Sequence, residues 1–322
     1  MKTLTIEEAN ELLAAGEVVA IPTETVYGLA ADARSDAAVR KIFTAKGRPA
    51  DNPLIVHIGD IGQVDELVTG VTDKARLLMT HFWPGPLTVI LPSTNRVSNL
   101  VTAGLTTLGL RMPSHETASE LLRTSGIPLA APSANLSGKP SPTSAAHVRH
   151  DMTGRIAGVV DGGVCNVGLE STVIDMTSDM PVILRPGGVS QAQIEAVIGS
   201  VDVAEGSAEK PRSPGMKYTH YSPDAQVYLV DGSDLYFERM IDKYQHNGLK
   251  VGVLCGDLHI AKYPIGVVTK GIGNQGRHLY AALRAFDAQG VEVVLCEFFE
   301  DAAVMNRLLK ASEERVLREV ED

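Results

Sequence analysis

The 322-residue sequence contains few cysteines and no long apolar segment. Its three cysteines, Cys165, Cys255 and Cys296, are odd in number and widely separated, which predicts reduced, packed thiols and argues against a disulfide framework or a zinc site. No apolar run approaches the roughly 20 residues that span a bilayer, and residues 1–5 lack the apolar core of a signal peptide. We therefore expect a cytoplasmic protein without a membrane segment.

Positive charge is also scarce, because 29 Lys and Arg face 39 Asp and Glu and leave a formal net charge of -10. Such a chain repels phosphate backbones as a whole, so any contact with nucleic acid needs a local basic patch. The length and the 44% hydrophobic content are those of a globular protein of about two domains.

Short apolar segments and helical patterns predict an α/β domain with a mixed sheet over residues 1–200. Thr5 and Glu8 form a capping box for a helix that ends at Gly16, and residues 18–21 form a strand. Further strands are expected at 54–58, 87–91, 108–112, 129–131, 156–160, 172–176 and 182–184, and further helices at 117–123, 143–150 and 191–198.

The next segment, residues 201–224, is rich in small, charged and proline residues, which is typical of a linker. Residues 225–322 again alternate apolar segments with helical patterns and predict a smaller, Rossmann-like α/β domain. Its strands are expected at 227–230, 251–254, 265–268 and 291–295, and its helices at 235–244, 278–287 and 302–317.

Two cations flank the predicted end of a helix that is capped by Ser35 or Asp36 and closed by Gly47. Lys46 and Arg48 combine an ammonium group with a guanidinium fork, which could neutralise the phosphates of a nucleotide. The helix dipole also favours cations at a C-terminus, so a solvated helix end is the alternative.

Polar side chains follow the strand expected at residues 129–131. Ser133 and Asn135 project where α/β sheets usually bind ligands, although they are also typical of a polar turn. Ser141 is predicted to cap a helix whose first residue is Pro142, which leaves N–H groups for a phosphate or carboxylate. Most such caps bind nothing, so the pair of features counts for more than either one.

Arginines end two apolar strands, Arg111 in G-L-R-M-P and Arg185 in L-R-P-G. Each needs open solvent or an anionic partner, either a substrate carboxylate or one of the protein's own acidic residues. Ser171 precedes a strand and is by itself an ordinary turn residue. His57 lies in L-I-V-H-I, where a histidine is more often a hydrogen-bonded core residue than a catalyst.

Residues 271–276 match G-x-G-x-x-G after a strand-like segment and before a helix, which suggests a dinucleotide site. The motif lies late in a small domain, whereas the dinucleotide fingerprint belongs to the first strand–helix turn. This makes a nicotinamide cofactor the weaker hypothesis.

The motifs in chain order resemble the YrdC/Sua5 family. The blocks P-T-E-T-V-Y-G-L, K-G-R-P-A-D-N-P-L-I-V-H, W-P-G-P-L-T, G-L-R-M-P, A-P-S-A-N, S-P-T, D-G-G, G-L-E-S-T and L-R-P-G are similar to a YrdC domain over about residues 5–200. S-P-G-M-K-Y-T-H-Y-S-P and M-N-R-L-L-K-A-S resemble the linker and C-terminal domain of the two-domain Sua5 form.

The resemblance implies formation of L-threonylcarbamoyl-adenylate from L-threonine, bicarbonate and ATP, with release of pyrophosphate, as the first step toward threonylcarbamoylation of adenosine 37 in tRNA. The product would pass to a tRNA threonylcarbamoyl-transfer machinery. By motif position, the threonine-binding residues would be Thr25, His57, Arg111, Ala131 and Ser171. The nucleotide would be surrounded by Lys46, Arg48, Asn52, Thr107, Ser133, Ser141, Arg185 and Tyr221, with Asn135 assisting Lys46 and Arg48 in catalysis by orienting bicarbonate or the carbamate.

Mg²⁺ is expected to arrive on the phosphates of ATP, with no protein-held metal. Tyr218, His220 and Tyr221 are aromatic or imidazole side chains in a polar stretch, so we expect the linker to cover the nucleotide as a lid. The alternatives are a double-stranded RNA- or tRNA-binding module of the same fold, with a weak RNA contact, and carbamoyl transfer through carbamoyl-adenylate. The latter would require carbamoyl phosphate as the donor and additional domains, neither of which we expect here.

Overall fold

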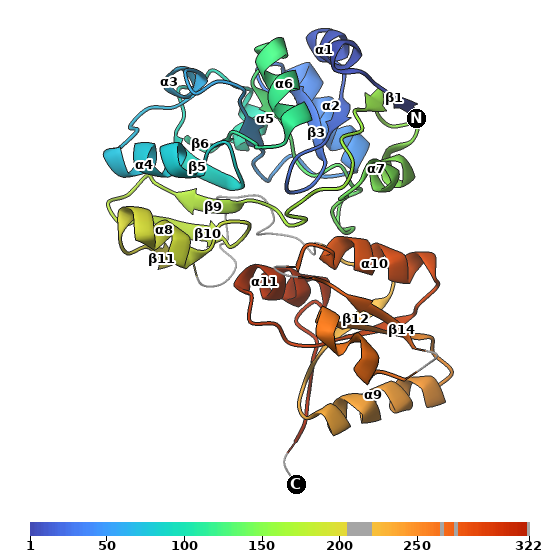
Figure 1. Cartoon of the computed structure of the whole chain (residues 1–322). Helices are drawn as coiled ribbons and strands as arrows, with labels where there is room; N and C mark the ends of the chain where they lie inside the picture. Colours follow the sequence, from blue (N-terminus) through green and yellow to red (C-terminus); the bar gives the residue numbers. More distant parts are fainter. Residues whose placement is uncertain (205–220, 265–266, 274–275, 321–322) are drawn as a thin grey trace. The chain divides into compact units, whose positions relative to one another are not determined.

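The computed structural model describes residues 1–204, 221–264, 267–273 and 276–320 (Figure 1). Its contacts group the chain into two compact units, the first comprising Met1–Ser137 with Ser141–Tyr218 and the second Gly138–Pro140 with Thr219–Asp322. The predicted boundaries at 1–200, 201–224 and 225–322 stay predictions. Within the described ranges, every helix is too short or too polar to traverse a bilayer.

The first unit is built on a mixed sheet with the strand order β1-β8-β2-β3-β7-β4-β6-β5-β9-β10-β11, as predicted from its composition of strands and helices. The strands are β1 (Lys2–Thr3), β2 (Val19–Ile21), β3 (Gly28–Asp32), β4 (Ile55–His57), β5 (Leu87–Pro92), β6 (Thr107–Arg111), β7 (Leu129–Ala130), β8 (Gly158–Val159), β9 (Thr172–Asp175), β10 (Val182–Arg185) and β11 (Asp202–Val203). The helices are α1 (Ile6–Ala14), α2 (Asp36–Lys46), α3 (Gln63–Leu67), α4 (Asp73–Phe82), α5 (Asn99–Thr102), α6 (Glu116–Ser125), α7 (Ala145–Met152) and α8 (Gln191–Ile198).

Local sequence signals explain where several helices begin and end. Thr5 and Glu8 form the predicted capping box of α1. Ser35 caps α2 by accepting a hydrogen bond from the Ala38 amide, and Gly47 ends that helix in the left-handed region at φ 62°. The chain therefore turns sharply between Lys46 and Arg48.

The two faces of the sheet differ in what covers them. One face of the sheet contributes alternate side chains of its strands to the main core. Val56 of β4 and Leu110 of β6 pack there with the helical residues Ile42 and Leu78. On the opposite face, α1 and α6 cover the part of the sheet near β2, β3 and β7, where Leu13 and Leu121 pack with Ile21 and Ala30. Farther along that face, a small cluster contains Ile55, Ile90, Val173 and Leu184, and none of its described members belongs to a helix.

Parts of the first unit differ from expectation. The strand β3 and the helices α3, α4 and α5 were not predicted. Helix α7 begins at Ala145, with Ser144 as its N-cap, so the prediction that Ser141 caps a helix starting at Pro142 is wrong. The start of the expected linker, Asp202–Val203, forms the edge strand β11 beside β10.

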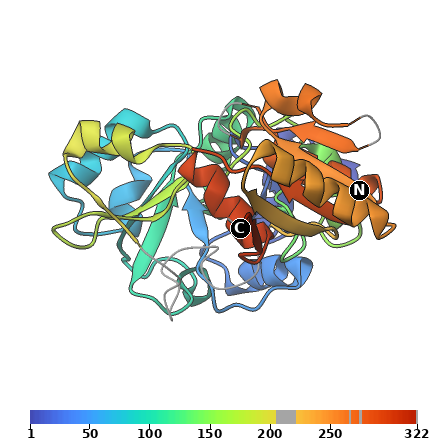
Figure 2. The same ribbon diagram turned by 90° about the horizontal axis from the view of Figure 1, so that it is seen from below.

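The second unit has a parallel sheet in the order β14-β13-β15-β12-β16, which confirms a second α/β domain. Figure 1 and Figure 2 draw its strands and helices in orange and red. Its elements are β12 (Gln226–Asp231), α9 (Asp234–His246), β13 (Val251–Cys255), the 3₁₀ helix η1 (Asp257–Lys262), β14 (Val268–Gly271), α10 (Leu279–Ala288), β15 (Val293–Cys296), α11 (Ala302–Ala311) and β16 (Val316–Arg318). The helix expected over 302–317 therefore ends earlier, because Glu313 and Glu314 adopt positive φ and the chain enters β16.

The G-x-G-x-x-G segment is placed unfavourably for a dinucleotide. Gly271 ends β14, which is an edge strand of the sheet and not its first strand. The Gly273 amide donates to the Asp257 carboxylate at 3.0 Å, so an acidic side chain occupies the position where a phosphate would accept. Residues 274–275 lie outside the described ranges.

Candidate active site

The ends of two neighbouring strands bring Arg111 and His57 together. Strands β4 and β6 are parallel, and His57 is the register partner of Arg111. The buried Arg111 guanidinium donates from Nη1 to Thr25 Oγ1 at 2.9 Å and from Nε to the Gly85 carbonyl at 3.3 Å. Its Nη2 lies 2.7 Å from Glu24 Oε1. The loop after β2 therefore wraps around the end of β6.

His57 is a neutral imidazole at physiological pH. Its burial, with the charge of Arg111 as a second cause, lowers its pKa from 6.5 to about 3. Nδ1 is buried and has no hydrogen-bond partner among the described residues. A neutral ring nitrogen in this position can donate to or accept from a bound hydroxyl group.

Ser171 and Arg185 lie at the next strands of the same sheet. Arg185 ends β10 and donates from Nη2 to the Ser171 carbonyl at 2.9 Å and to its hydroxyl at 3.2 Å. The Ser171 hydroxyl also lies 2.8 Å from that of Thr88 on β5. Gly187 allows this approach, since a Cβ there would stand 2.3 Å from the Glu170 carbonyl oxygen.

Lys46, the last residue of α2, reaches the polar loop that follows β7. Its Nζ donates to the carbonyls of Ser133 at 2.5 Å and Asn135 at 2.9 Å. Burial and then the charge of Arg48 lower the pKa of Lys46 well below its ordinary value, while Asp151 and Glu170 act in the opposite direction. An anion bound here would favour the charged ammonium form.

The segment after Gly47 returns toward the sheet. The buried Arg48 donates from Nη2 to the Asn52 carbonyl at 3.3 Å, and Asn52 itself is fully buried. The side-chain amide of Asn135 donates to the Leu136 carbonyl at 2.8 Å, which fixes its orientation. These two amide-bearing residues thus belong to ordered loops around the cations.

Ser141 has a different role from the predicted helix cap. Its hydroxyl donates to Glu170 Oε1 at 2.6 Å, and both side chains are buried. Because Glu170 precedes Ser171, this hydrogen bond connects the loop after β7 to the group around Arg185. The free helix N-terminus expected at Pro142 is absent from this described segment.

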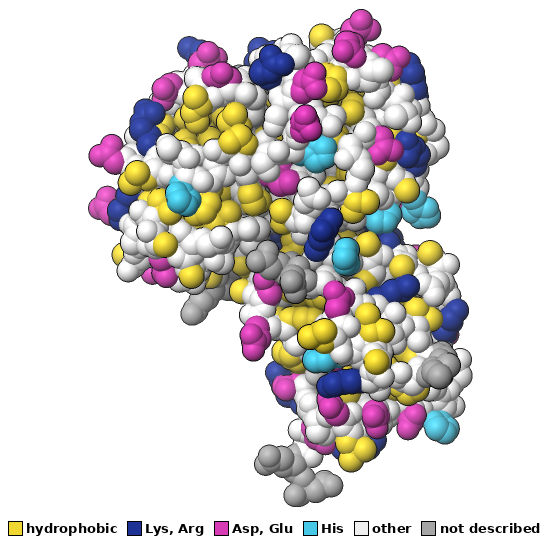
Figure 3. All heavy atoms as spheres, viewed as in Figure 1, with side chains coloured by type: hydrophobic (Ala, Val, Ile, Leu, Met, Phe, Trp, Pro, Cys, Tyr) yellow, Lys and Arg dark blue, Asp and Glu magenta, His cyan; other side chains and the backbone are white. Residues whose placement is uncertain are grey.

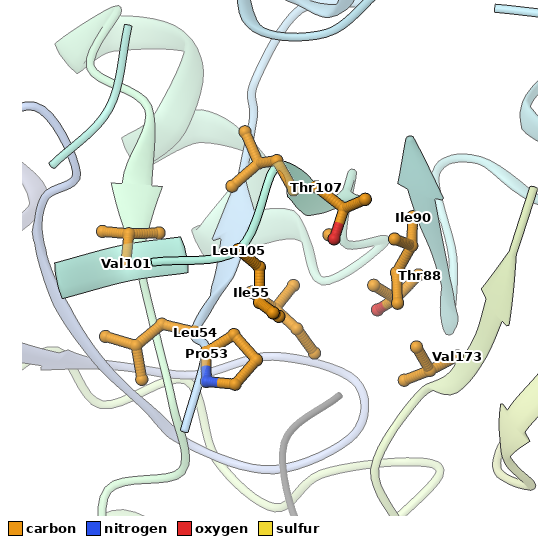
Figure 4. A pocket seen from close by; sticks show the side chains of 11 residues that line it. Pro53, Leu54, Ile55, Thr88, Ile90, Val101, Leu105, Thr107 and Val173 are labelled. Atoms are coloured by element: carbon orange, nitrogen blue, oxygen red, sulfur yellow. The ribbon is translucent and has the colours of Figure 1, made fainter. Parts of the chain in front are cut away.

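A pocket beside β4, β5 and β6 contains Thr107, at the opposite end of β6 from Arg111 (Figure 4). The labelled side chains in Figure 4 are aliphatic except for the hydroxyls of Thr88 and Thr107. It is lined by Pro53, Leu54, Ile55, Thr88, Ile90, Val101, Leu105, Thr107, Leu108, Gly109 and Val173. The lining is thus mainly apolar.

The predicted site residues therefore fall into connected groups in the first unit. The backbone of Ala131, which follows β7, is attached to β4, because the Ala131 amide donates to the Ile55 carbonyl at 3.0 Å. Tyr221 belongs to the second unit, where its ring packs 5.3 Å from that of Tyr280. Tyr218 and His220 lie outside the described residues. The predicted lid and the contact of Tyr221 with the nucleotide stay predictions.

Four buried polar residues in these groups were not singled out from the sequence: Glu24, Thr88, Asp151 and Glu170. Glu24 and Glu170 stand within the motifs P-T-E-T and G-L-E-S-T, and Thr88 interrupts the apolar run of β5. An acidic or hydroxyl side chain inside such a motif or apolar run was the signal that could have identified these three residues. Asp151, on α7, offered none of this kind.

Comparisons with known proteins match both parts of the chain. Residues 11–187 match the Sua5–YciO–YrdC family, described as telomere recombination, and residues 189–313 match a family described as threonylcarbamoyl-AMP synthase, C-terminal domain. A threonylcarbamoyl-AMP synthase of Bacillus subtilis is 51% identical over 97% of this chain and 94% of its own length. One from Pyrococcus abyssi is 46% identical over 94% and 92%.

A solved structure is similar over almost the whole length. The crystal structure of Pyrococcus abyssi Sua5 complexed with L-threonine has a TM-score of 0.92 at 44% identity and covers 98% of this chain and 96% of its own. The motifs, the two α/β units and these matches agree. This chain belongs to the Sua5–YciO–YrdC family, in its two-domain Sua5 form.

Proposed function

We infer that this chain, like its relatives, is a nucleotidyltransferase that forms threonylcarbamoyl-AMP from ATP and L-threonine. The observation that carries this conclusion is the grouping of buried Arg111, Thr25 and His57 at adjacent strand ends, in the same unit as buried Lys46 and Arg48. One group suits a small amino acid and the other suits phosphates.

We propose that Arg111 binds the carboxylate of threonine and that Thr25, His57, Ala131 and Ser171 surround its remaining atoms. The support is the buried guanidinium, held from Gly85 and Thr25, and the neutral imidazole beside it. A preoriented guanidinium can hold a carboxylate through two parallel N–H donors.

The nucleotide would take the adjoining region, with the base near Thr107 and its apolar pocket and the phosphates near Lys46 and Arg48. The support is that Pro53 and Leu54 of this pocket directly follow Asn52, whose carbonyl accepts from Arg48. The remaining residues proposed to contact ATP are Ser133, Ser141, Arg185 and Tyr221.

The chemistry requires positioning more than a nucleophile on the protein. Bicarbonate is a weak electrophile and an N-carboxylated amino acid readily loses carbon dioxide, so the carbamate must form beside the α-phosphate with little water present. Asn135 is proposed to orient bicarbonate or the carbamate. Lys46 and Arg48 would stabilise charge on the phosphates and on departing pyrophosphate.

Mg²⁺ is proposed to enter with ATP. The side chains proposed to contact the phosphates are cations and hydroxyls. A protein that holds Mg²⁺ itself usually does so through carboxylates, and none is proposed at this position. At a fixed ATP concentration, the rate of pyrophosphate release should follow the concentration of the Mg²⁺–ATP complex. A rate that is independent of Mg²⁺ after treatment with EDTA contradicts this part of the proposal.

The use of bicarbonate, transfer of the product to a tRNA-modifying machinery, a weak RNA contact and a cytoplasmic location also remain proposals. Three free, buried cysteines support a reducing compartment. The rival RNA-binding module expects strong, steeply salt-dependent binding without turnover, against which the net charge of -10 argues.

The test is pyrophosphate release by the full chain with each substrate omitted in turn. We expect release only with ATP, threonine and bicarbonate together, and a large loss of activity in Arg48→Ala and Arg111→Ala. Release that ignores threonine or bicarbonate, or parent-like activity of both variants, contradicts the proposed function.

A further inference from the structure

Glu24 is a buried acidic residue to which the proposed function assigns no role. It is 5% exposed and lies between Thr23 and Thr25 in the loop after β2. The loop is held at several points, because the Thr23 hydroxyl donates to the Val26 carbonyl at 2.6 Å and the Val167 amide donates to the Glu24 carbonyl at 2.7 Å. The backbone at Glu24 is therefore held in place, and its carboxylate lies beside Arg111.

The carboxylate of Glu24 has an unusual environment for a buried anion. Its Oε1 lies 2.7 Å from Arg111 Nη2, but neither oxygen accepts a properly oriented hydrogen bond from any described residue. Other buried acids in this unit are better satisfied: Glu170 accepts from Ser141, and Asp175 accepts from the amide and hydroxyl of Thr177. The ion pair with Arg111 compensates the charge at Oε1, whereas Oε2 has no donor among the described residues. A buried oxygen without a donor is costly, so a bound group with N–H donors is expected to complete the site.

The charges around this position match an amino acid. Arg111 is positive and Glu24 is negative, and His57 is neutral because burial lowers its pKa to about 3. The three side chains therefore sum to zero, as do the ammonium and carboxylate of zwitterionic threonine. A carboxylate that approached Arg111 without an accompanying cation would be repelled by Glu24.

We propose that Glu24 binds the α-ammonium group of the amino-acid substrate and thereby makes the site select amino acids over hydroxy acids. This inference rests on the proposed function, because it takes threonine as the occupant of the group around Arg111. Glu24 and Arg111 then form an adjacent pair of opposite charges that holds both charged groups of one small zwitterion. The side chain presents its hydrogen-bond acceptors to the nitrogen that must later form the carbamate.

The experiment compares L-threonine with (R)-3-hydroxybutyrate, which keeps the carboxylate, hydroxyl and methyl groups but lacks the amine. Calorimetric titration of the full chain gives the ratio of the two affinities. We expect the wild-type protein to prefer threonine, and Glu24→Gln to reduce that preference roughly 10- to 100-fold, the effect of losing a hydrogen bond to a charged group. The affinity of Glu24→Gln for hydroxybutyrate should be unchanged or higher, since the repelling carboxylate is gone.

Two further variants guard the interpretation. Glu24→Asp retains the charge and should retain most of the preference, whereas Glu24→Ala should lose it even if the glutamine variant folds poorly. Asp175→Asn alters another buried carboxylate of the same unit and should leave the ratio unchanged, because Asp175 accepts hydrogen bonds from Thr177 at the end of β9 away from Ser171.

The outcomes separate the two proposals. If Glu24→Gln and Glu24→Ala weaken both ligands by the same factor, Glu24 merely positions Arg111 and the inference is wrong. If the wild-type protein binds neither threonine nor hydroxybutyrate, the proposed function itself fails. A wild-type preference for threonine that persists in both variants also overturns the role of Glu24.

Discussion

His57 and Arg111 are direct partners in the parallel register of β4 and β6, and the charge of Arg111 contributes to keeping the imidazole neutral. Protonation of the His57 imidazole would therefore place a second positive charge beside Arg111 and destabilise the site. The neutral form also explains why the histidine can remain buried beside a guanidinium.

The first prediction concerns acid stability. The pKa of His57 is about 3 in the folded chain against 6.5 without perturbation, so the unfolded state binds the proton more readily. The stability is complete above pH 6.5 and falls as the pH drops toward 3. Between pH 7.5 and 5.5, the free energy of unfolding of His57→Gln should therefore fall by about 1 kcal/mol less than that of the wild type, as measured by urea unfolding. Equal losses in both proteins contradict this.

The second prediction concerns Lys46. The lowered pKa of its ammonium group means that ATP affinity should decline with rising pH earlier than an ordinary lysine would dictate. Lys46→Met should reduce pyrophosphate release about 100-fold and remove that pH dependence, because no titrating cation remains. Lys46→Arg is the matched control and should keep ATP affinity flat over the same range. A wild-type affinity that does not vary up to pH 10 would count against the assignment.

The third prediction concerns the close approach at Gly187. A Cβ there would meet the backbone of Glu170 and Ser171 at 2.3 to 2.4 Å, which only a backbone shift can relieve. Gly187→Ala should lower the free energy of unfolding by about 1–3 kcal/mol and also slow pyrophosphate release. Gly256→Ala is the control, since its nearest neighbour would be His259 Nδ1 at 3.8 Å. Similar behaviour of the two variants would show that the contact is not restrictive.

The fourth prediction separates two neighbouring serines. Ser144 caps α7 through the His147 amide, so Ser144→Ala should cost about 1 kcal/mol of stability while turnover stays at the parent rate. Ser141 instead donates to Glu170, and Ser141→Ala should raise the KM for ATP. Thermal melts and steady-state kinetics on both variants measure these effects. A changed KM in Ser144→Ala together with an unchanged KM in Ser141→Ala would contradict both assignments.

The sequence predicts an element well where local chemistry decides its ends. Ser35 and Gly47 bound α2 as expected, because an N-cap hydroxyl and a left-handed glycine act within one turn of the helix. Strand β3 was missed, because Gly28-Leu29-Ala30-Ala31-Asp32 has no β-branched residue. Its conformation comes from pairing with β2 and β7, which are defined by tertiary contacts.

The site was predictable in part for the same reason. Ser141-Pro142 and Ser144 both satisfy the local rule for a helix start, and the choice depends on Glu170, which lies 29 residues away from Ser141 in the sequence. The motifs identified Arg111 and Thr25 as site residues. Their direct hydrogen bond, and the place of Glu24 beside them, depend on a contact between a loop and a strand end that are 86 residues apart.

The alternation of side chains along β6 has a consequence for how this protein tolerates change. Thr107, Gly109 and Arg111 share one side of the strand, while Leu108 and Leu110 fill the helix-covered core on the other. Inserting or deleting a single residue within β6 would exchange these two sets and bury an arginine where a leucine belongs. A change in the length of this strand would therefore disrupt both the core packing and the position of Arg111. Additions at the exposed turn near Asn95 would disturb neither.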